Sequence, residues 1–416
     1  MRKLKIAVIG SGISGLATSW KLSKSCDVEL YEKNNYFGGH ANTQTVKLRD
    51  EKQFYVDTGF IVFNEINYPN LCHLFRNLGV ETYSSDMSFA ASINDGNVEY
   101  SGSSLLNMFA QKKNIFNPKF LKMIYEIIKF YRTVEKDAKI YTEHTLKDYL
   151  EEKSYSEYFK FYHIFPMASS IWSSSINEIS NFPFTQFVNF FSNHGLLNLV
   201  NRPKWRTVIE GSQTYVKKII DSPNLKSFKN SNVKVIKCNN NGVDLKINKK
   251  LKRFDHVVVA VHSDQVIKLV SCLGDEQKKL FRKIKYSANK VYLHTDNQFM
   301  PKRKSVWASW NYIQGKEHKK KLSVTYWMNK LQKLDTKKNI FVTLNPEKPP
   351  LRSKLIKKIL YKHPLFDLNT FKTQKRIKKI QGMNKIWFCG AYLGYGFHED
   401  GIKSGLSVAN KILEKK

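Results

Sequence analysis

Three glycines near the start of the chain have the spacing of a loop that holds a diphosphate. Gly10, Gly12 and Gly15 follow a short apolar run and precede a run of helical spacing. Gly10 permits a tight turn from strand to helix, Gly12 lets the backbone approach a pyrophosphate, and Gly15 lets the helix pack on the strand. Free N–H groups at a helix start, here Ile13 and Ser14, favour bound phosphate. The pattern predicts a nucleotide-binding site, with an ordinary glycine-rich turn as the alternative.

An acidic residue stands where the second strand of such a unit ends. Residues 28–31 have the pattern of a strand, and Glu32 follows them about twenty residues after the glycines. A carboxylate in this place accepts hydrogen bonds from ribose hydroxyls. We assign Glu32 and the adjacent Lys33 to the nucleotide site.

A glycine pair downstream of Glu32 indicates which nucleotide is bound. The sequence reads Gly38-Gly39-His40, which resembles the flavoprotein extension of the dinucleotide motif. In such proteins this pair lets the chain pass close to the FAD diphosphate and ribityl arm, and the next residue is usually Arg. His40 departs from that pattern at one phosphate contact. The resemblance implies FAD rather than a nicotinamide cofactor.

The positions of the other strands and helices predict an α/β fold. Residues 232–238 and 243–247 have the pattern of two strands around an Asn-Asn-Gly turn, 254–261 that of a buried parallel strand, and 385–390 that of a strand ending in glycine. Ile402 to Leu413 has the pattern of a closing helix. We therefore predict a discontinuous Rossmann-like FAD-binding domain over 1–62, 205–265 and 380–416, and an inserted α+β substrate-binding domain over 63–204 and 266–379.

Composition restricts the class of protein and of partner. The chain has 416 residues, of which 42% are hydrophobic, enough for two domains with large cores. The 69 Lys and Arg against 35 Asp and Glu give a formal charge of +34, which favours anionic partners. Because no helix-turn-helix, RNP-like or zinc-finger pattern is present, an anionic membrane surface is a better candidate than nucleic acid. Solubility together with a lysine-rich composition is the alternative.

Cysteine usage and hydropathy indicate the compartment. The five cysteines are scattered, without a Cys-X-X-Cys pair or a Cys/His cluster, so we predict no metal site. No secretory signal and no run of about 18 apolar residues are found. These features favour a reduced cytoplasmic location, with attachment to the inner face of the membrane as an extension. The oligomeric state is not fixed by these patterns.

The stretch over 103–175 has mostly helical patterns. Asn117-Pro118 has the pattern of a helix cap, and Phe120, Ile124 and Ile127 belong to an apolar face with lysines on the other side. The pattern predicts a core-facing helix with a solvated back; a basic amphipathic helix on a membrane surface is the alternative.

The chain resembles the flavin amine oxidase and phytoene desaturase superfamily over nearly its whole length. The segments that carry this resemblance are 56–63, 209–216 and 390–405. A narrower resemblance, to a bacterial group of predicted NAD/FAD-binding proteins associated with cyclopropane fatty acyl-phospholipid synthases, rests on 60–64, 85–89, 306–312 and 394–401. This group implies oxidation of modified membrane acyl chains.

The resemblance also implies roles for particular residues. It assigns flavin contacts to Gly390, Asp400, Gly401 and Ile402 in the C-terminal motif, and an adenine-side contact to Val235. The absence of a cysteine between Tyr395 and His398 implies that FAD is held without a covalent bond.

Three residues are candidates for catalysis. Lys290 resembles the lysine that holds a water near flavin N5 in amine oxidases, with a surface lysine as the alternative. Tyr395 and His398 lie in the flavin motif, where they either shape the wall and relay protons or pack silently. His163 and Trp172 belong to an aromatic stretch that is either core or the wall of an acyl tunnel.

The chemistry of flavin limits the substrate. A hydride leaves readily from a carbon beside an amine nitrogen or beside a double bond, because the developing cation is delocalised there. A basic exterior repels free polyamines and attracts anionic lipid. We therefore expect an FAD-dependent oxidoreductase that oxidises unsaturated or methyl-branched acyl chains of phospholipids. An amine oxidase for a small amine or amino acid is the alternative, and a non-catalytic flavin-binding or lipid-carrying protein is a third hypothesis.

Overall fold

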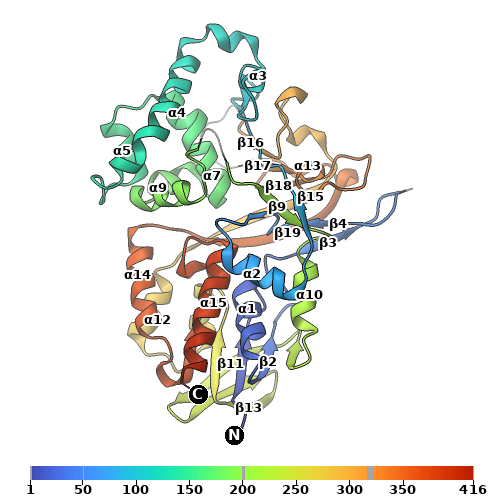
Figure 1. The fold of residues 1–416 in the computed structure, drawn as a ribbon, viewed down its shortest axis with the longest axis vertical. Coiled ribbons are helices and arrows are strands. Elements are labelled where there is room, and N and C mark those ends of the chain that lie inside the picture. The colour runs from blue at the N-terminus through green and yellow to red at the C-terminus, as the bar shows by residue number, and fades with distance from the viewer. Residues whose placement is uncertain (1, 50, 199–201, 316–322, 416) are drawn as a thin grey trace.

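The computed structural model describes residues 2–49, 51–198, 202–315 and 323–415. A five-stranded parallel sheet forms its lower part (Figure 1). Its strand order is β10-β2-β1-β14-β20, and all neighbouring pairs are parallel. The bounds are β1 Lys5–Ile9, β2 Asp27–Tyr31, β10 Leu225–Phe228, β14 His256–Val259 and β20 Ile386–Phe388. These strands are almost continuously apolar because both faces of the sheet are covered.

Helices cover one face of this sheet and a mixed layer covers the other. The first layer packs around Leu16, Val28 and Ile402 and consists of α1 Ile13–Leu22, α2 Pro69–Leu78, α10 Gln213–Ile220 and α15 His398–Leu413. The second layer packs around Ile9, Phe281 and Ile377. Its helices are α11 Ser263–Leu269, α12 Asp275–Arg282 and α14 Leu368–Lys379. Its antiparallel sheet consists of β11 Val233–Asn239, β12 Gly242–Ile247 and β13 Lys250–Phe254.

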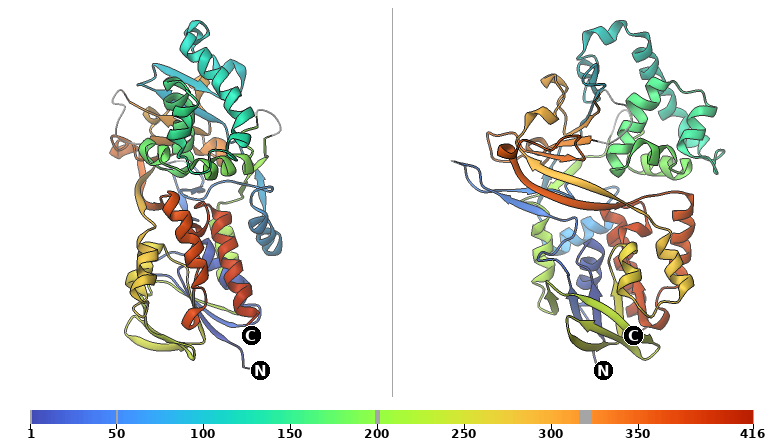
Figure 2. Two further views of the ribbon diagram at one scale, coloured as in Figure 1. Left: turned by 90° about the vertical axis from the view of Figure 1, so that its left-hand side faces the viewer. Right: turned by 180° about the vertical axis from the view of Figure 1, so that it is seen from behind.

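A seven-stranded mixed sheet organises the upper part. Its order is β19-β15-β18-β17-β16-β7-β8. The bounds are β7 Phe89–Ile93, β8 Val98–Ser101, β15 Tyr286–His294, β16 Trp310–Ile313, β17 Ser323–Trp327, β18 Phe341–Leu344 and β19 Leu355–Pro364. Figure 2 shows from behind how the long paired strands β15 and β19 run between this sheet and the lower part. Smaller sheets join β3 Thr43–Val46 to β4 Phe54–Asp57, and β9 Trp205–Val208 to β5 Phe63–Asn64 and β6 Thr82–Ser84.

A cluster of helices packs beside the upper sheet through an aromatic core that includes Phe130, Phe159 and Phe187 (Figure 1). The helices are α3 Leu105–Met108, α4 Pro118–Asp137, α5 Leu146–Glu152, α6 Glu157–Phe159, α7 Phe165–Trp172, α8 Ile176–Ser180 and α9 Phe184–Asn193; the short helix α13 Met328–Gln332 follows β17. Asn117 caps α4 by accepting hydrogen bonds from the N–H groups of Lys119 and Phe120. Phe120 and Ile127 of α4 are buried in the core, so this face of α4 is not free for a membrane.

The predicted fold class is confirmed: a Rossmann-like parallel sheet carries an inserted mixed α and β part. The domain boundaries remain a proposal, with one adjustment. Helices α2, α12 and α14 lie inside the ranges predicted for the substrate-binding domain but pack against the parallel sheet. We therefore propose that the second segment of the substrate-binding domain extends only from β15 to β19.

Two cysteines that are far apart in the sequence meet in the lower part. Cys238 at the end of β11 and Cys272 after α11 form a disulfide, with their Cα atoms 6.2 Å apart. Cys26 and Cys389 are buried and free. The cysteine spacing did not indicate this pair. Because disulfides are more frequent in oxidising compartments, the cytoplasmic location remains a proposal.

Candidate functional site

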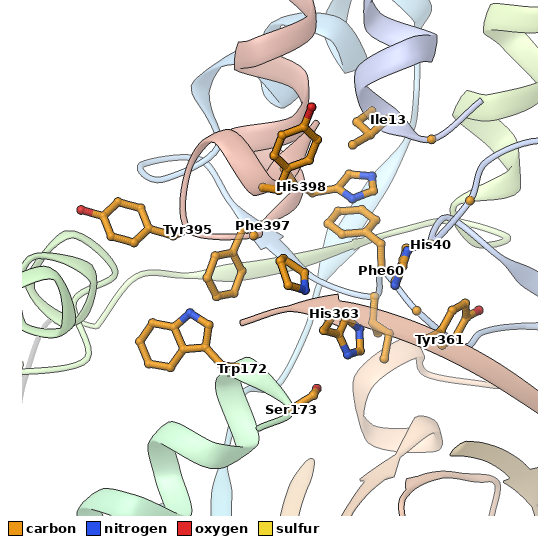
Figure 3. A pocket seen from close by; sticks show the side chains of 18 of the residues that line it. Ile13, His40, Phe60, Trp172, Ser173, Tyr361, His363, Tyr395, Phe397 and His398 are labelled. Atoms are coloured by element: carbon orange, nitrogen blue, oxygen red, sulfur yellow. The ribbon is translucent and has the colours of Figure 1, made fainter. Parts of the chain in front are cut away.

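A cavity of about 1420 Å³ runs from the parallel sheet to the helices of the upper part. One end is lined by residues at the carboxyl ends of the parallel strands, where α/β sheets bind ligands. The other end reaches α7 and α9, and Figure 3 shows side chains from both parts facing each other across the space. Ordinary small-molecule pockets measure roughly 300–1,000 Å³, so this cavity has room for a dinucleotide and a second molecule.

The glycine loop borders the lower end of the cavity. Gly10 has φ +102°, and a Cβ there would lie 2.5 Å from the carbonyl oxygen of Ala260. A Cβ on Gly15 would lie 1.9 Å from the carbonyl oxygen of Gly10, so only glycine lets α1 start this close to β1. A Cβ on Gly12 would meet nothing within 4 Å, because Gly12 faces the cavity. Each glycine therefore has the geometry that its predicted role requires.

Glu32 is placed by the same loop. Its Oε2 accepts hydrogen bonds from the N–H of Ser11 at 3.0 Å and from the Ser11 hydroxyl at 2.7 Å, and its Oε1 accepts one from the N–H of Asn34 at 2.9 Å. Both Glu32 and Lys33 line the cavity. A carboxylate accepts up to about four hydrogen bonds, so the Glu32 side chain retains capacity for a ribose.

The second glycine pair brings a histidine to the cavity wall. Gly38 has φ +115°, and a Cβ on Gly39 would lie 3.1 Å from Gly12 Cα, so the two glycine segments touch. The His40 ring lies 4.7 Å from the ring of Tyr361 and 5.1 Å from that of His363 (Figure 3). Burial lowers the pKa of His40 well below its usual value. Its Nε2 is buried and has no protein partner.

The C-terminal motif forms the facing wall. Gly390, Tyr395, Phe397 and His398 line the cavity. Asp400 does not; its Oδ2 accepts hydrogen bonds from the N–H groups of Tyr395 and Phe397, each at 3.0 Å. Burial raises the pKa of Asp400 to about 6. Asp400 thus shapes the turn that presents the wall residues.

Gly401 and Ile402 hold α15 in place behind that wall. A Cβ on Gly401 would lie 2.6 Å from Ile13 Cγ2, and Ile402 is fully buried in the core around α1. Neither residue lines the cavity. Their predicted contact with the cofactor is therefore replaced by a contact between helices.

His398 is held between two aromatic rings. It stacks on Phe60 with ring centroids 3.8 Å apart, and its Nε2 lies 2.6 Å from the hydroxyl oxygen of Tyr215. Burial lowers the pKa of His398 to about 3 and raises the pKa of Tyr215 well above its usual value. A protonated Tyr215 therefore donates to Nε2 of a neutral imidazole, and the geometry favours a positioning role for His398 over proton relay.

Comparison with known proteins agrees with this geometry. The model of the flavin-containing amine oxidoreductase family matches residues 13–328. The chain belongs to this family. It is an FAD-dependent oxidoreductase, and the absence of a cysteine from the wall over 395–398 accords with a non-covalent cofactor.

Solved structures share the whole fold at low sequence identity. Cyclohexylamine oxidase from Brevibacterium oxydans IH-35A matches with TM-score 0.70 and 15% identity, over 100% of this chain and 99% of that one. Putrescine oxidase bound to putrescine matches with 0.68 and 15%, over 99% of each chain. A fatty acid isomerase from P. acnes that produces CLA matches with 0.67 and 11%, over 98% of each chain. No curated protein matches the sequence.

The residues of this flavoprotein fit FAD. Gly12 and Gly39 leave a cradle without side chains, and Ile13 and Ser14 bring the start of α1 to the same place. The buried Nε2 of His40 supplies a polar atom that has no partner within the protein. This chemistry suits a diphosphate, with His40 in the place of the more usual Arg.

The structure places Lys290 away from the cavity. Side chains alternate between the two faces of a strand, and in β15 the inward side chain is Asn289, whose Nδ2 lies 2.8 Å from His363 Nδ1. Lys290 is exposed on the opposite face and pairs with Leu360. It does not line the cavity, so the alternative of a surface lysine holds.

The structure places Val233, and not the predicted Val235, at the cavity. Val233 lines the cavity, whereas Val235 does not. Val235 is fully buried, and its carbonyl oxygen accepts a hydrogen bond from the N–H of Ser271 at 3.1 Å. Both valines point to one face of β11, but only Val233 lies near the strand end that reaches the cavity.

The sequence did not identify most of the upper wall. It consists of residues from segments that are far apart in the chain: Met87, Phe89, Met167, Ile171, Phe190, Leu196, Trp310 and Tyr326. Trp172 does line the cavity, as the tunnel alternative required, whereas His163 lies between the hydroxyls of Tyr100 and Tyr131. His262 and His363 also border the cavity. His262 directly follows the predicted strand over 254–261, and this position at the carboxyl end of a parallel strand is the signal that could have found it.

The described residues contain no group of three or more His, Cys, Asp or Glu side chains placed to hold a metal ion. Within the same part of the chain, no helix is both long and apolar enough to cross a membrane.

Proposed function

We propose that the enzyme oxidises unsaturated or methyl-branched acyl chains of membrane phospholipids and works peripherally at the inner face of the membrane. The observation that carries this proposal is the apolar upper wall of the cavity. The ring of Trp172 at the end of α7 lies 4.7 Å from that of Phe190 on α9 and 6.2 Å from that of Phe397 in the flavin motif, and Figure 3 shows Trp172 and Phe397 on facing sides of the cavity. Met167 and Ile171 of α7 line the same cavity. Such a wall buries methylene groups, each worth about 0.8 kcal/mol.

The charges around the upper end support an anionic substrate. Arg202 and Lys204 are exposed and line the cavity there. Asp86 is the acidic residue on this side, and it accepts hydrogen bonds from Ser88 and Ser309. The charge of Asp86 is paired with that of Lys330, whose Nζ lies 3.5 Å from the Oδ2 of Asp86. A phosphate or carboxylate head group is attracted to this rim, and a free ammonium group is repelled.

The reaction balances as a two-electron oxidation. FAD supplies, when bound, an acceptor for a hydride at N5. The C–H bond beside an existing double bond breaks and its electron pair leaves as hydride; the neighbouring carbon loses a proton to solvent, and a second double bond forms. Tyr395, Phe397 and Trp172 would hold the chain against the flavin.

Amine oxidation is the second candidate. The family is described as amine oxidoreductases, and the aromatic side chains of Tyr395 and Phe397 are of the type that surrounds amines. The two candidates differ in the charge that the upper wall tolerates. An acyl chain requires an apolar wall, whereas an ammonium group can bind beside a carboxylate.

Anaerobic stopped-flow absorbance of the flavin band tests the proposal. We expect bleaching by phospholipids with an unsaturated chain, methyl-branched or not, and none by putrescine or cyclohexylamine. Ile171→Asp should slow lipid-driven bleaching at least tenfold, since a charge in an apolar wall costs more than about 1.4 kcal/mol. Asn177→Asp, at an exposed position on α8, is the matched control. Bleaching by an amine alone, retained in Ile171→Asp, would establish the second candidate instead.

A further inference from the structure

One end of the helical cluster exposes large apolar side chains. Leu106 of α3 and Phe116 of the 3-10 helix Lys112–Phe116 are each 86% exposed, and Tyr125 of α4 is 66% exposed. Ile115 and Leu121 are also exposed. Figure 1 places α3 and the start of α4 at the upper end of the molecule, opposite both termini. We call these five residues the apical patch.

The segment that carries the apical patch has charges of one sign. Residues 102–125 contain four lysines and no acidic residue. Lys112, Lys113, Lys119 and Lys122 are all exposed. The nearby carboxylate of Glu126 is buried and accepts a hydrogen bond from the N–H of Ser156 at 3.0 Å. Apolar side chains that alternate with lysines along a segment without acidic residues are typical of surfaces that enter the interface of an anionic bilayer.

The apical patch is continuous with the mouth of the cavity. Gly102 and Ser103 are exposed, line the cavity and directly precede α3. Tyr131, less than two turns beyond Tyr125 on α4, also lines it. A surface in contact with the apical patch would therefore lie close to the opening through which a long substrate reaches the interior.

We infer that the apical patch docks on an anionic lipid bilayer, with its apolar side chains at the level of the acyl chains and its four lysines on the phosphates. Contact with the bilayer would present an acyl chain to the cavity mouth at Gly102 and Ser103. This inference rests on the proposed lipid substrate for its purpose, but the docking is measured without turnover.

Vesicle sedimentation tests the docking. The flavin-loaded enzyme is mixed with vesicles of phosphatidylglycerol and phosphatidylcholine in equal parts, or of phosphatidylcholine alone. We expect binding to the anionic vesicles that salt weakens. The double variant Leu106→Ser with Phe116→Ser should bind at least tenfold more weakly. Lys119→Gln with Lys122→Gln should bind roughly 25-fold more weakly, about fivefold for each lysine.

Matched variants at the opposite end are the controls. Leu251→Ser on β13 removes a side chain that is 72% exposed, and Lys375→Gln with Lys378→Gln removes two exposed lysines from α14. Both should bind as wild type. Retained flavin absorbance shows that each variant is folded. Equal binding by all variants, or loss of binding in the control variants, would overturn the assignment.

Two further measurements separate this inference from its alternatives. The fluorescence of an indole introduced by Phe116→Trp should be quenched by brominated lipid, and that of one introduced by Leu251→Trp should not.

Sedimentation velocity without lipid should give the same mass for wild type and the Leu106→Ser, Phe116→Ser variant. A wild-type dimer that the variant dissociates, without vesicle binding, would make the apical patch a self-association surface. Docking without any flavin bleaching by lipid would uphold this inference and refute the proposed substrate.

Discussion

At the scale of single residues, the site depends on side chains that are fixed by the backbone around them. Glu32 is anchored by Ser11 and Asn34 before any cofactor binds, and Asp400 is anchored by the N–H groups of Tyr395 and Phe397. Such anchoring removes rotamer freedom that binding would otherwise have to remove.

Replacement of Glu32 should weaken FAD retention without unfolding the protein. Glu32→Ala removes the ribose acceptors and leaves the Ser11 N–H without its partner. Hydrogen bonds to charged groups contribute about 1.5–3 kcal/mol, so we expect the Kd of FAD to rise roughly tenfold to a hundredfold. Flavin fluorescence during titration of the apoprotein measures this. Glu29→Ala on the same strand, where Glu29 pairs with Lys252, is the control; an equal loss there would show a general effect on β2.

At the scale of elements, two helices bring their N-termini to one cavity because they pack through glycine. The Oγ1 of Thr18 on α1 donates a hydrogen bond to the carbonyl oxygen of Gly405 on α15 at 3.1 Å. A Cβ on Gly405 would lie 2.3 Å from the carbonyl oxygen of Ser14. The helices cannot approach this closely with any larger residue.

Gly405→Ala should therefore destabilise the protein and loosen the cofactor together. Overpacking of this kind costs about 1–3 kcal/mol, and separation of α1 from α15 moves Ile13 and the wall at His398. Urea unfolding and flavin release during dialysis measure the two effects. Ser407→Ala, on the exposed side of α15, should change neither. Unchanged flavin retention in a destabilised Gly405→Ala would mean that the site tolerates the shift.

At the scale of the whole molecule, buried neutral histidines make the fold sensitive to acid. Burial lowers the pKa of His194, His256, His294 and His363 to about 4 from the usual 6.5. Below pH 6.5 the unfolded chain binds protons at these rings and the folded chain does not, so the free energy of unfolding falls as pH decreases. The loss continues until pH reaches about 4, where the folded state is protonated as well.

The slope of this loss gives a test. Each such imidazole contributes about 1.4 kcal/mol per pH unit within the window. Urea unfolding of the apoprotein at several pH values between 6.5 and 4 should show the decline in the free energy of unfolding. His256→Leu should reduce the slope of this decline by the contribution of one imidazole. His73→Leu, at an exposed position on α2, should leave the slope unchanged. A slope insensitive to His256→Leu would place the acid sensitivity elsewhere.

The sequence by itself determined the parts of the site that form within one short segment. The loop over Gly10, Gly12 and Gly15, the acid at Glu32 and the pair Gly38-Gly39 were all readable, because each requirement is local: a positive φ, the absence of a Cβ or the end of a strand. The parallel strand around Val258 was readable for the same reason, since burial on both faces produces an uninterrupted apolar run.

Tertiary structure alone decided which side of each element faces the cavity. Strand β15 could bury either Asn289 or Lys290, and its pairing with β19 buried Asn289 against His363, which lines the cavity, and left Lys290 exposed. The meeting of Cys238 with Cys272 required the packing of α11 on β11, and the apolar wall at Trp172 combines segments distant in the chain. The physical reason is that strand alternation and helical periodicity define faces, while only the neighbouring elements decide which face is covered.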